Sequence, residues 1–271
     1  MSRGWGIIEA FREVLPGWAP ELFTYVTQLG DVWLLFVVGA LCYWFNDDRE
    51  RFAFVLAVTL GALALTLALK EFFALARPNE TLRIVDSSGY GFPSGHAIGS
   101  TVFWGVLALA VDRWNRGIRI AGAAVIVTLV ILSRIIIGVH FAIDVIVGVA
   151  VGLAYLAFVV KGLRWRPTPA FGLAVVIALV AVLLALQPPT TDHGMLDAVA
   201  ALGGTVGALL LWWGVGPPDG SVTPIAGAAG LVALGVLSYV GLELSIPLVA
   251  VFVVNAVVQA GVVAYPRIAG Q

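Results

Sequence analysis

Six ionisable side chains stand in three short motifs between residues 70 and 144, and their types suit the handling of phosphate. The motifs are Lys70-x6-Arg77-Pro78, Pro93-Ser94-Gly95-His96 and Ser133-Arg134-x5-His140-x3-Asp144. Together they hold three cations, two histidines and one carboxylate. Ionisable groups beside membrane-length apolar runs are costly in free energy, so they indicate a functional site.

Lys70 and Arg77 supply the first part of a predicted anion site. Seven residues of α-helix make nearly two turns, so the two side chains face one side, about 10 Å apart along the axis. Pro78 then ends the helix. Two cations on one side can hold the oxygens of a phosphate, and arginine does so with a planar fork. Taken singly, the pair also fits two cations that snorkel at a helix end.

Pro93-Ser94-Gly95-His96 predicts the start of a helix. Ser94 can cap that helix, and Gly95 permits close approach of the backbone. Free backbone N–H groups at a helix start bind anions, which would place His96 at the rim of the anion. A helix cap without further role explains this motif equally well when it is taken singly.

His140 and Asp144 are i and i+4, so they share one face of a helix. A carboxylate on one ring nitrogen fixes the tautomer and leaves the other nitrogen free as a nucleophile, as in a catalytic triad. Arg134 lies just upstream and can add a third cation. For this motif taken singly, a structural His–Asp pair is the alternative.

The rest of the chain places these groups in a membrane. Of its 271 residues, 61% are apolar and 11% are charged, whereas a soluble domain carries roughly 25% charged residues. The composition therefore predicts an integral membrane protein and excludes a soluble enzyme. The net charge of −1 predicts no binding of nucleic acid. The single cysteine, Cys42, lies in an apolar run, and the chain has no CxxC or zinc-type spacing.

Nine apolar segments predict membrane spans, because a span needs about 20 apolar residues. They are 29–46, 51–73, 96–112, 118–138, 140–160, 169–187, 197–215, 223–242 and 246–265. We therefore expect an all-α, polytopic bundle of transmembrane helices. Before it, Ile7, Ile8 and Phe11 follow helical spacing, which predicts an amphipathic helix on the membrane surface.

Arginine and lysine predict the orientation of the bundle. If the spans alternate, one side receives Arg49, Arg51, Arg113, Arg116, Arg119, Lys161, Arg164, Arg166 and Arg267. The other side receives Arg3, Arg12, Lys70, Arg77, Arg83 and Arg134, and three of these belong to the motifs. We expect the first side to be cytoplasmic, so all three motifs fall on the outer side.

Taken together, the motifs resemble the signature of the type 2 phosphatidate phosphatase family, the PAP2 superfamily, which is K-x6-RP, PSGH and SR-x5-H-x3-D. All its defining positions match: Lys70, Arg77, Pro78, Pro93, Ser94, Gly95, His96, Ser133, Arg134, His140 and Asp144. A chance match at so many positions is negligible, so the signal is specific. It covers about residues 50–160, and the last four spans carry none of it.

The resemblance implies a metal-independent phosphatase that needs no cofactor and forms a phosphohistidine. His140 would attack phosphorus, oriented by Asp144, and His96 would protonate the leaving oxygen and then serve as base. The phosphate oxygens would be bound by Lys70, Arg77, Ser94, Gly95 and Arg134.

Three parts are expected along the chain. Residues 1–28 form the interfacial amphipathic segment, and residues 29–165 form the PAP2-type catalytic core of about five to six helices. Residues 166–271 form additional C-terminal spans. These extra spans could make a second small bundle, a dimer surface in a homo-oligomer, or a wall through which lipid reaches the site.

The expected substrate is a lipid phosphate or diphosphate, because an outward-facing site between spans lets a lipid tail remain in the bilayer. The candidates are a polyprenyl diphosphate, phosphatidate and phosphatidylglycerol phosphate. The first is placed slightly ahead, since recycling of that carrier needs an outward-facing phosphatase. Nine spans with an outer amino terminus also resemble the glucose-6-phosphatase branch. A lipid phosphotransferase would use the same phosphohistidine, and a transporter is suggested by the span number without further support.

Other polar residues stand outside the motifs. The loop 77–93, with Arg83, Asp86 and Tyr90, could act as a lid or select the headgroup. Asn255 and Gln259 are i and i+4 in the last span and are predicted to bond between helices.

His193, with Asp192 and Asp197 nearby, lies in an outer loop. It could touch a headgroup, although an exposed histidine is common in loops of any kind. Gly148 with Gly152, and Gly203 with Gly207, have the spacing that favours close contact between helices.

Overall fold

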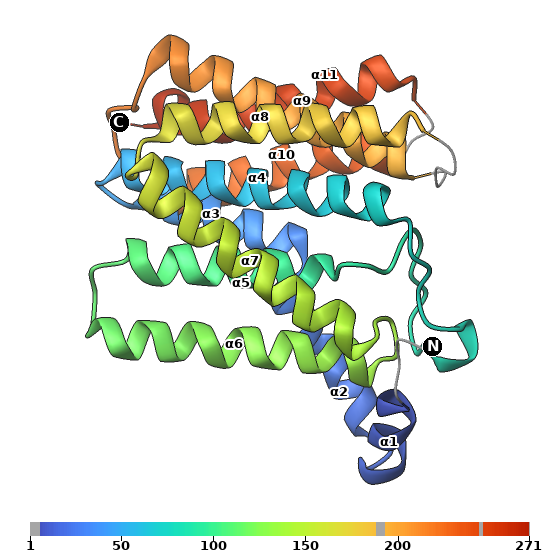
Figure 1. The fold of residues 1–271 in the computed structure, drawn as a ribbon. Coiled ribbons are helices and arrows are strands. Elements are labelled where there is room, and N and C mark those ends of the chain that lie inside the picture. The colour runs from blue at the N-terminus through green and yellow to red at the C-terminus, as the bar shows by residue number, and fades with distance from the viewer. Residues whose placement is uncertain (1–5, 188–192, 244–245, 271) are drawn as a thin grey trace.

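The computed structural model of the chain is helical throughout (Figure 1). It describes residues 6–187, 193–243 and 246–270. Their α-helices are α1 (Ile7–Val14), α2 (Ala19–Val26), α3 (Val32–Phe45), α4 (Arg49–Phe73), α5 (Gly95–Ala110), α6 (Arg116–Ile136), α7 (Ala142–Leu163), α8 (Pro167–Ala185), α9 (Gly194–Val215), α10 (Pro224–Glu243) and α11 (Leu248–Ala269). Two short 3-10 helices are η1 (Thr27–Gly30) and η2 (Glu80–Leu82). The expected all-α bundle is confirmed.

Each of the nine predicted apolar segments is a helix, from α3 to α11. Within the described residues, six of them are long and apolar enough to cross a membrane, namely α4, α6, α7, α8, α9 and α11. A seventh span results if α3 is joined to α2 and η1 across a bend of 45°. The helix α5 and the stretch Pro224–Tyr239 of α10 are shorter apolar segments, so among the described residues fewer helices qualify as spans by length than the nine expected.

The length of α5 has a local cause. Its 16 residues extend about 24 Å at 1.5 Å per residue, which is less than the hydrocarbon thickness of about 30 Å. The sequence before it, up to Ser94, is drawn into the candidate site and is not helical. The helix therefore begins directly at the second motif.

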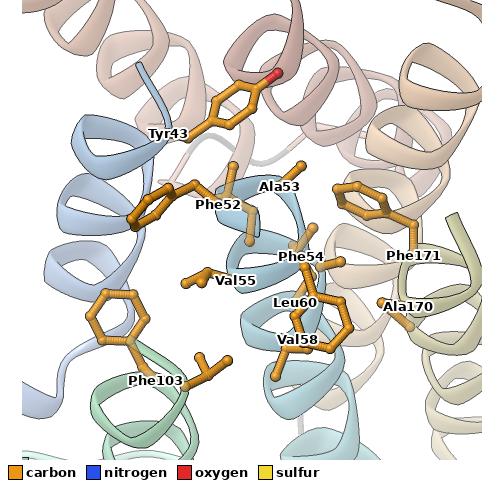
Figure 2. Close-up of a cluster of buried hydrophobic side chains, with 14 of the residues drawn as sticks. Tyr43, Phe52, Ala53, Phe54, Val55, Val58, Leu60, Phe103, Ala170 and Phe171 are labelled. Atoms are coloured by element: carbon orange, nitrogen blue, oxygen red, sulfur yellow. The ribbon is translucent and has the colours of Figure 1, made fainter. Parts of the chain in front are cut away.

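Helix α4 is the centre of the bundle, with α5 and α7 on one side and α8 and α9 on the other (Figure 1). It is apolar on all faces, which is typical of a helix surrounded by others. Figure 2 shows Phe54 and Leu60 of α4 between Phe103 of α5 and Phe171 of α8, and these side chains are buried. This packing fixes the axis of α4, whose last turn carries Lys70.

Glycines allow two pairs of helices to approach closely, as their spacing predicted. A Cβ atom built on Gly148 of α7 would lie 2.8 Å from Cβ of Ala97 in α5, and one on Gly152 would lie 2.9 Å from Cβ of Thr101. On α9, Gly203 and Gly207 face backbone carbonyl groups of α11 too closely for any side chain. The first contact holds α7 against the start of α5, where the second motif lies.

The amphipathic helix near the amino terminus is confirmed as α1, and much of its apolar face packs on the protein. Ile8 is 1% exposed and lies in a cluster with Ile135 of α6 and Val145 of α7. The side chain of Arg12 donates to the carbonyl of Leu82, at 2.7 Å, in the loop between α4 and α5. A place for α1 on the membrane surface stays a prediction.

The two ends of the bundle differ in charge. The arginines and the lysine assigned to the cytoplasmic side lie at the starts of α4, α6 and α8 and at the ends of α7 and α11. There Arg267 donates to the carbonyls of Val215 and, at 2.9 Å, Pro217, which satisfies the end of α9. The three motifs meet at the other end.

Candidate active site

The three motifs line one cavity of about 480 Å³. Its wall includes five of the charged or titratable side chains of the motifs, Lys70, Arg77, His96, Arg134 and His140, together with Gly95. The volume lies within the usual range of small-ligand sites, roughly 300–1,000 Å³. The sequence therefore predicted correctly that residues far apart in the chain come together.

His140 lies between a cation and a carboxylate. Its Nε2 is 3.2 Å from Nη1 of Arg77, and its Nδ1 is 3.7 Å from Oδ2 of Asp144. Both His140 and Asp144 are buried. At 3.7 Å the carboxylate acts on the ring through its charge, and a small rotation of either side chain would complete a hydrogen bond.

The surroundings of His140 keep its ring neutral. Burial, followed by the charges of Arg134 and Arg77, holds the pKa of His140 well below its ordinary value. Burial, with Arg83 nearby and against the pull of Asp144, lowers the pKa of Arg77 to about 10. At neutral pH a charged guanidinium therefore faces an uncharged imidazole, which leaves Nε2 with a lone pair.

The spacing between Arg134 and His140 follows from the turn that joins α6 to α7. The backbone N–H groups of Val139 and His140 both donate to the carbonyl of Arg134, at 3.2 Å. Gly138 has φ +77°, and a Cβ atom there would collide with the carbonyl of Leu82. Only glycine fits this turn, since it accepts a positive φ without a steric penalty.

The loop 77–93 closes one side of the cavity. Arg77 donates from Nε to the carbonyl of Ser88 at 3.0 Å, and Arg83 donates to the carbonyl of Pro78 at 2.9 Å. Asp86, Ser87 and Ser88 line the cavity. Arg83 is thus a support of the loop, and Asp86 is the member of the predicted trio that faces the site.

Ser94 caps α5 as predicted, since its Oγ accepts from the N–H of Ala97 at 3.4 Å. Its own N–H donates to the backbone carbonyl of Asp144 at 3.0 Å, which ties the second motif to the third. Gly95 faces α4, and a Cβ atom there would lie 2.8 Å from Thr66 and 3.9 Å from Nζ of Lys70. The absent side chain lets Lys70 reach the helix start.

Besides Nδ1 of His140, two buried nitrogen atoms of cavity-lining side chains have no hydrogen-bond partner among the described residues, namely Nε2 of His96 and Nε of Arg134. Buried polar atoms are nearly always satisfied, so an unsatisfied pair at a cavity marks the place of a ligand. The guanidinium of Arg134 is held in place, because its Nη1 donates to Oγ1 of Thr27 at 2.7 Å. Both free atoms can donate to an anion.

Sequence reasoning missed Asp31 and gave Asp197 little weight. Asp31, between η1 and α3, lines the cavity with its Oδ2 3.9 Å from Nε2 of His96. Asp197, in the first turn of α9, also lines the cavity, whereas His193 is exposed and does not. The sequence signal that could have indicated Asp31 is a carboxylate at the start of an apolar run. Asp192 lies outside the residues that the structure describes.

The comparisons with known proteins agree with this geometry. A sequence profile described as the PAP2 superfamily matches residues 51–168. The chain is 31% identical over 156 residues to phosphatidylglycerophosphatase B of Bacillus subtilis, an alignment that covers 54% of this chain and 75% of that protein. It is 34% identical over 155 residues to a lipid A 4'-phosphatase of Porphyromonas gingivalis, covering 51% of this chain and 64% of that one.

Among solved structures, a transmembrane PAP2 type phosphatidylglycerolphosphate phosphatase from Bacillus subtilis is similar, with a TM-score of 0.53 and 28% identity. The match covers 59% of this chain and 83% of that chain. The chain therefore belongs to the PAP2 superfamily. It is an integral, multi-pass membrane phosphatase of that superfamily, as the motifs and the composition predicted.

Proposed function

We propose that this protein hydrolyses a lipid phosphate at the outer membrane face through a phosphohistidine on His140. The observation that carries the proposal is the position of His140, whose Nε2 faces the cavity beside Arg77 while its Nδ1 faces Asp144. A neutral ring held in this way has one nitrogen available to attack phosphorus.

The reaction has two displacement steps. In the first, Nε2 of His140 forms a bond to phosphorus, the bond to the lipid oxygen breaks, and His96 gives its proton to that oxygen. In the second, His96 takes a proton from water, the water oxygen bonds to phosphorus, and the N–P bond breaks. Inorganic phosphate leaves, and both histidines return to their starting states.

The cations bind the oxygens that carry the negative charge. Lys70, Arg77 and Arg134 approach the cavity from three different elements, so they can surround a phosphoryl group. Charge stabilisation by fixed donors is the main requirement of phosphoryl transfer. Backbone N–H groups at the start of α5, at Gly95 and His96, would add donors to the same oxygens.

The relatives favour a phosphorylated lipid over a sugar phosphate. One relative is named as a phosphatidylglycerophosphatase, and the other is named as a lipid A 4'-phosphatase. Phosphatidylglycerol phosphate and phosphatidate therefore come first for this chain, followed by a polyprenyl diphosphate. A phosphotransferase that hands the same phosphoryl group to an alcohol remains the second candidate function.

The distribution of charge supports the proposed outer location. The motifs lie at the end of the bundle opposite the arginine-rich end, which is the end expected in the cytoplasm. A cysteine placed at exposed Ile84, in a Cys42→Ala background, should react with an impermeant maleimide in intact cells, and one at exposed Trp114 should not. The reverse pattern would contradict the orientation and leave the chemistry untouched.

The chemistry is tested by phosphate release from purified protein in EDTA. The panel contains phosphatidylglycerol phosphate, phosphatidate, a polyprenyl diphosphate and glucose 6-phosphate, each with and without an acceptor alcohol. We expect release from a lipid, lost in His140→Ala, and an acid-labile phosphoenzyme after rapid quenching. Release from the sugar phosphate only, or phosphate found on the acceptor only, would refute lipid hydrolysis.

A further inference from the structure

A second cavity, of about 560 Å³, lies between α3, α10 and α11. Most of its wall is apolar, with Val37, Ala40, Leu231, Leu234 and Val258 among the lining residues. At one end it shares Asp31, Val32 and Phe36 with the cavity of the active site. We call this second cavity the α3–α10–α11 groove.

A smaller cavity of about 280 Å³ joins the two. It shares Asp197 and Leu67 with the active site, and it shares Ser238 and Gln259 with the groove. Phe36 of α3 lines all three spaces. The three spaces therefore adjoin in one row, from the phosphate site past Phe36 to the apolar groove, and we call this row the passage.

The groove exists because α10 diverges from α3. Near their cytoplasmic ends the helices touch, since a Cβ atom on Gly227 would lie 2.7 Å from the ring of Phe45. Two turns later, a Cβ atom on Gly235 would meet nothing within 4 Å. Helix α10 is held by α11 instead, where Oη of Tyr265 donates to the carbonyl of Ala226 at 2.5 Å.

The polar residues of the passage were expected to bond between helices. For Asn255 this is wrong, because its amide donates to the carbonyl of Val251 one turn earlier in α11, at 2.9 Å. Gln259 lines both the passage and the groove. An amide at this depth is costly unless it meets a polar partner, and the oxygens of an ester linkage would be such a partner.

We propose that the α3–α10–α11 groove binds one acyl chain of a glycerophospholipid substrate, with Gln259 facing the ester that links this chain to glycerol. This inference rests on the proposed lipid hydrolysis. The order of chemistry along the passage supports it: cations for the phosphate, then amide groups for the ester, then an apolar groove for the hydrocarbon. Helices α9, α10 and α11, which lie beyond residues 51–168, would then determine which lipid is bound.

A side chain that fills the groove tests the proposal. Gly235→Phe places a ring in the groove without a built-in clash, since the site of its Cβ is open. Gly172→Phe is the matched control, because the Cβ site at Gly172 in α8 is equally open and lines none of the three cavities. Both variants are first compared with the wild type for monodispersity and thermal unfolding in detergent.

The assay compares dioleoyl with dihexanoyl phosphatidate. For Gly235→Phe we expect kcat/KM to fall about tenfold or more with the long chains and to stay within about twofold with the short chains. For Gly172→Phe both substrates should behave as they do with the wild type. Equal loss with both chain lengths, or no loss with either, would overturn the groove as an acyl site while lipid hydrolysis stands.

The ester is tested with Gln259→Leu, which keeps the approximate volume and removes the amide. We expect a lower kcat/KM with the diacyl substrate and no change with a polyprenyl phosphate, which has no carboxylic ester. An equal effect on both lipids would overturn the role given to Gln259. If the wild type releases phosphate from no lipid at all, the proposed function fails, and the acyl site fails with it.

Discussion

Asp144→Asn is the sharpest test of how His140 is activated. The carboxylate is buried, and its Oδ2 accepts from the N–H of Phe141 at 2.9 Å while it faces Nδ1 of His140 at 3.7 Å. An asparagine oxygen can keep the bond to Phe141 and adds no volume. The substitution therefore removes the charge with little effect on the fold.

The size of the effect follows from the distance. When Nε2 bonds to phosphorus while Nδ1 keeps its proton, the ring becomes a cation. At 3.7 Å and an effective dielectric constant of about 20, a carboxylate stabilises that cation by about 4 kcal/mol. Since about 1.4 kcal/mol corresponds to tenfold in rate, kcat should fall by about three orders of magnitude.

The assay is pre-steady-state phosphate release together with the amount of trapped phosphoenzyme. Asp144→Asn should form phosphoenzyme slowly and should unfold near the wild-type temperature. Asp48→Asn is the control, because Asp48 caps α4 at the opposite end of the bundle and asparagine also caps helices. A kcat for Asp144→Asn within about tenfold of the wild type would refute electrostatic activation and leave Asp144 a structural role.

Three further changes test other parts of the site. Arg77→Lys loses the fork that faces His140 and Ser88, so kcat should fall about a hundredfold or more, measured as phosphate release. The folded pKa of His140 lies well below its ordinary value, so kcat/KM should not fall near pH 6.5 through protonation of His140. The free energy of unfolding should begin to fall below that pH, because the unfolded chain takes up the proton there. A drop in kcat/KM with an apparent pKa near 6.5 that is assigned to His140 would contradict the buried neutral ring. Gly138→Val should lower the free energy of unfolding by about 2 kcal/mol or more, because of the positive φ at this position and the clash with Leu82. Thermal unfolding measures this loss, and a variant as stable as the wild type would contradict the tight turn.

The motifs and the spans could be predicted from the sequence because each rests on local information. Arg134 and His140 share one turn, so their spacing already limits their positions. The expectation that Lys70 and Arg77 share a helix ended by Pro78 was wrong, because α4 ends at Phe73 and Arg77 lies in the loop that follows. The nine apolar segments were visible from composition. Their convergence at one end follows from alternation of the spans, which needs no knowledge of side-chain packing.

Other features depend on packing between distant helices and could not be predicted in this way. The divergence of α10 from α3 depends on Gly227, Gly235 and Tyr265, none of which has a signal of its own. Asn255 was assigned a partner on another helix because a sequence shows which residues are polar and not which carbonyl lies nearest.

The carboxylates of the cavity show how the parts of the chain share the site. Residues 51–168, which match the family, supply the cations and His140, the proposed nucleophile. Asp31 and Asp197, from elements outside that range, line the same cavity, with Asp31 near His96 and Asp197 within electrostatic reach of Lys70.

Cations gathered in a poorly solvated cavity repel one another, and unpaired buried charge destabilises a fold. Nearby carboxylates offset that repulsion while the site is free. A bound phosphate replaces them as the partner of the cations, and the same carboxylates then repel the product. Under the proposed function, Asp31 and Asp197 would therefore supply negative charge that balances a strongly basic cavity before an anion binds and favours release of the product afterwards.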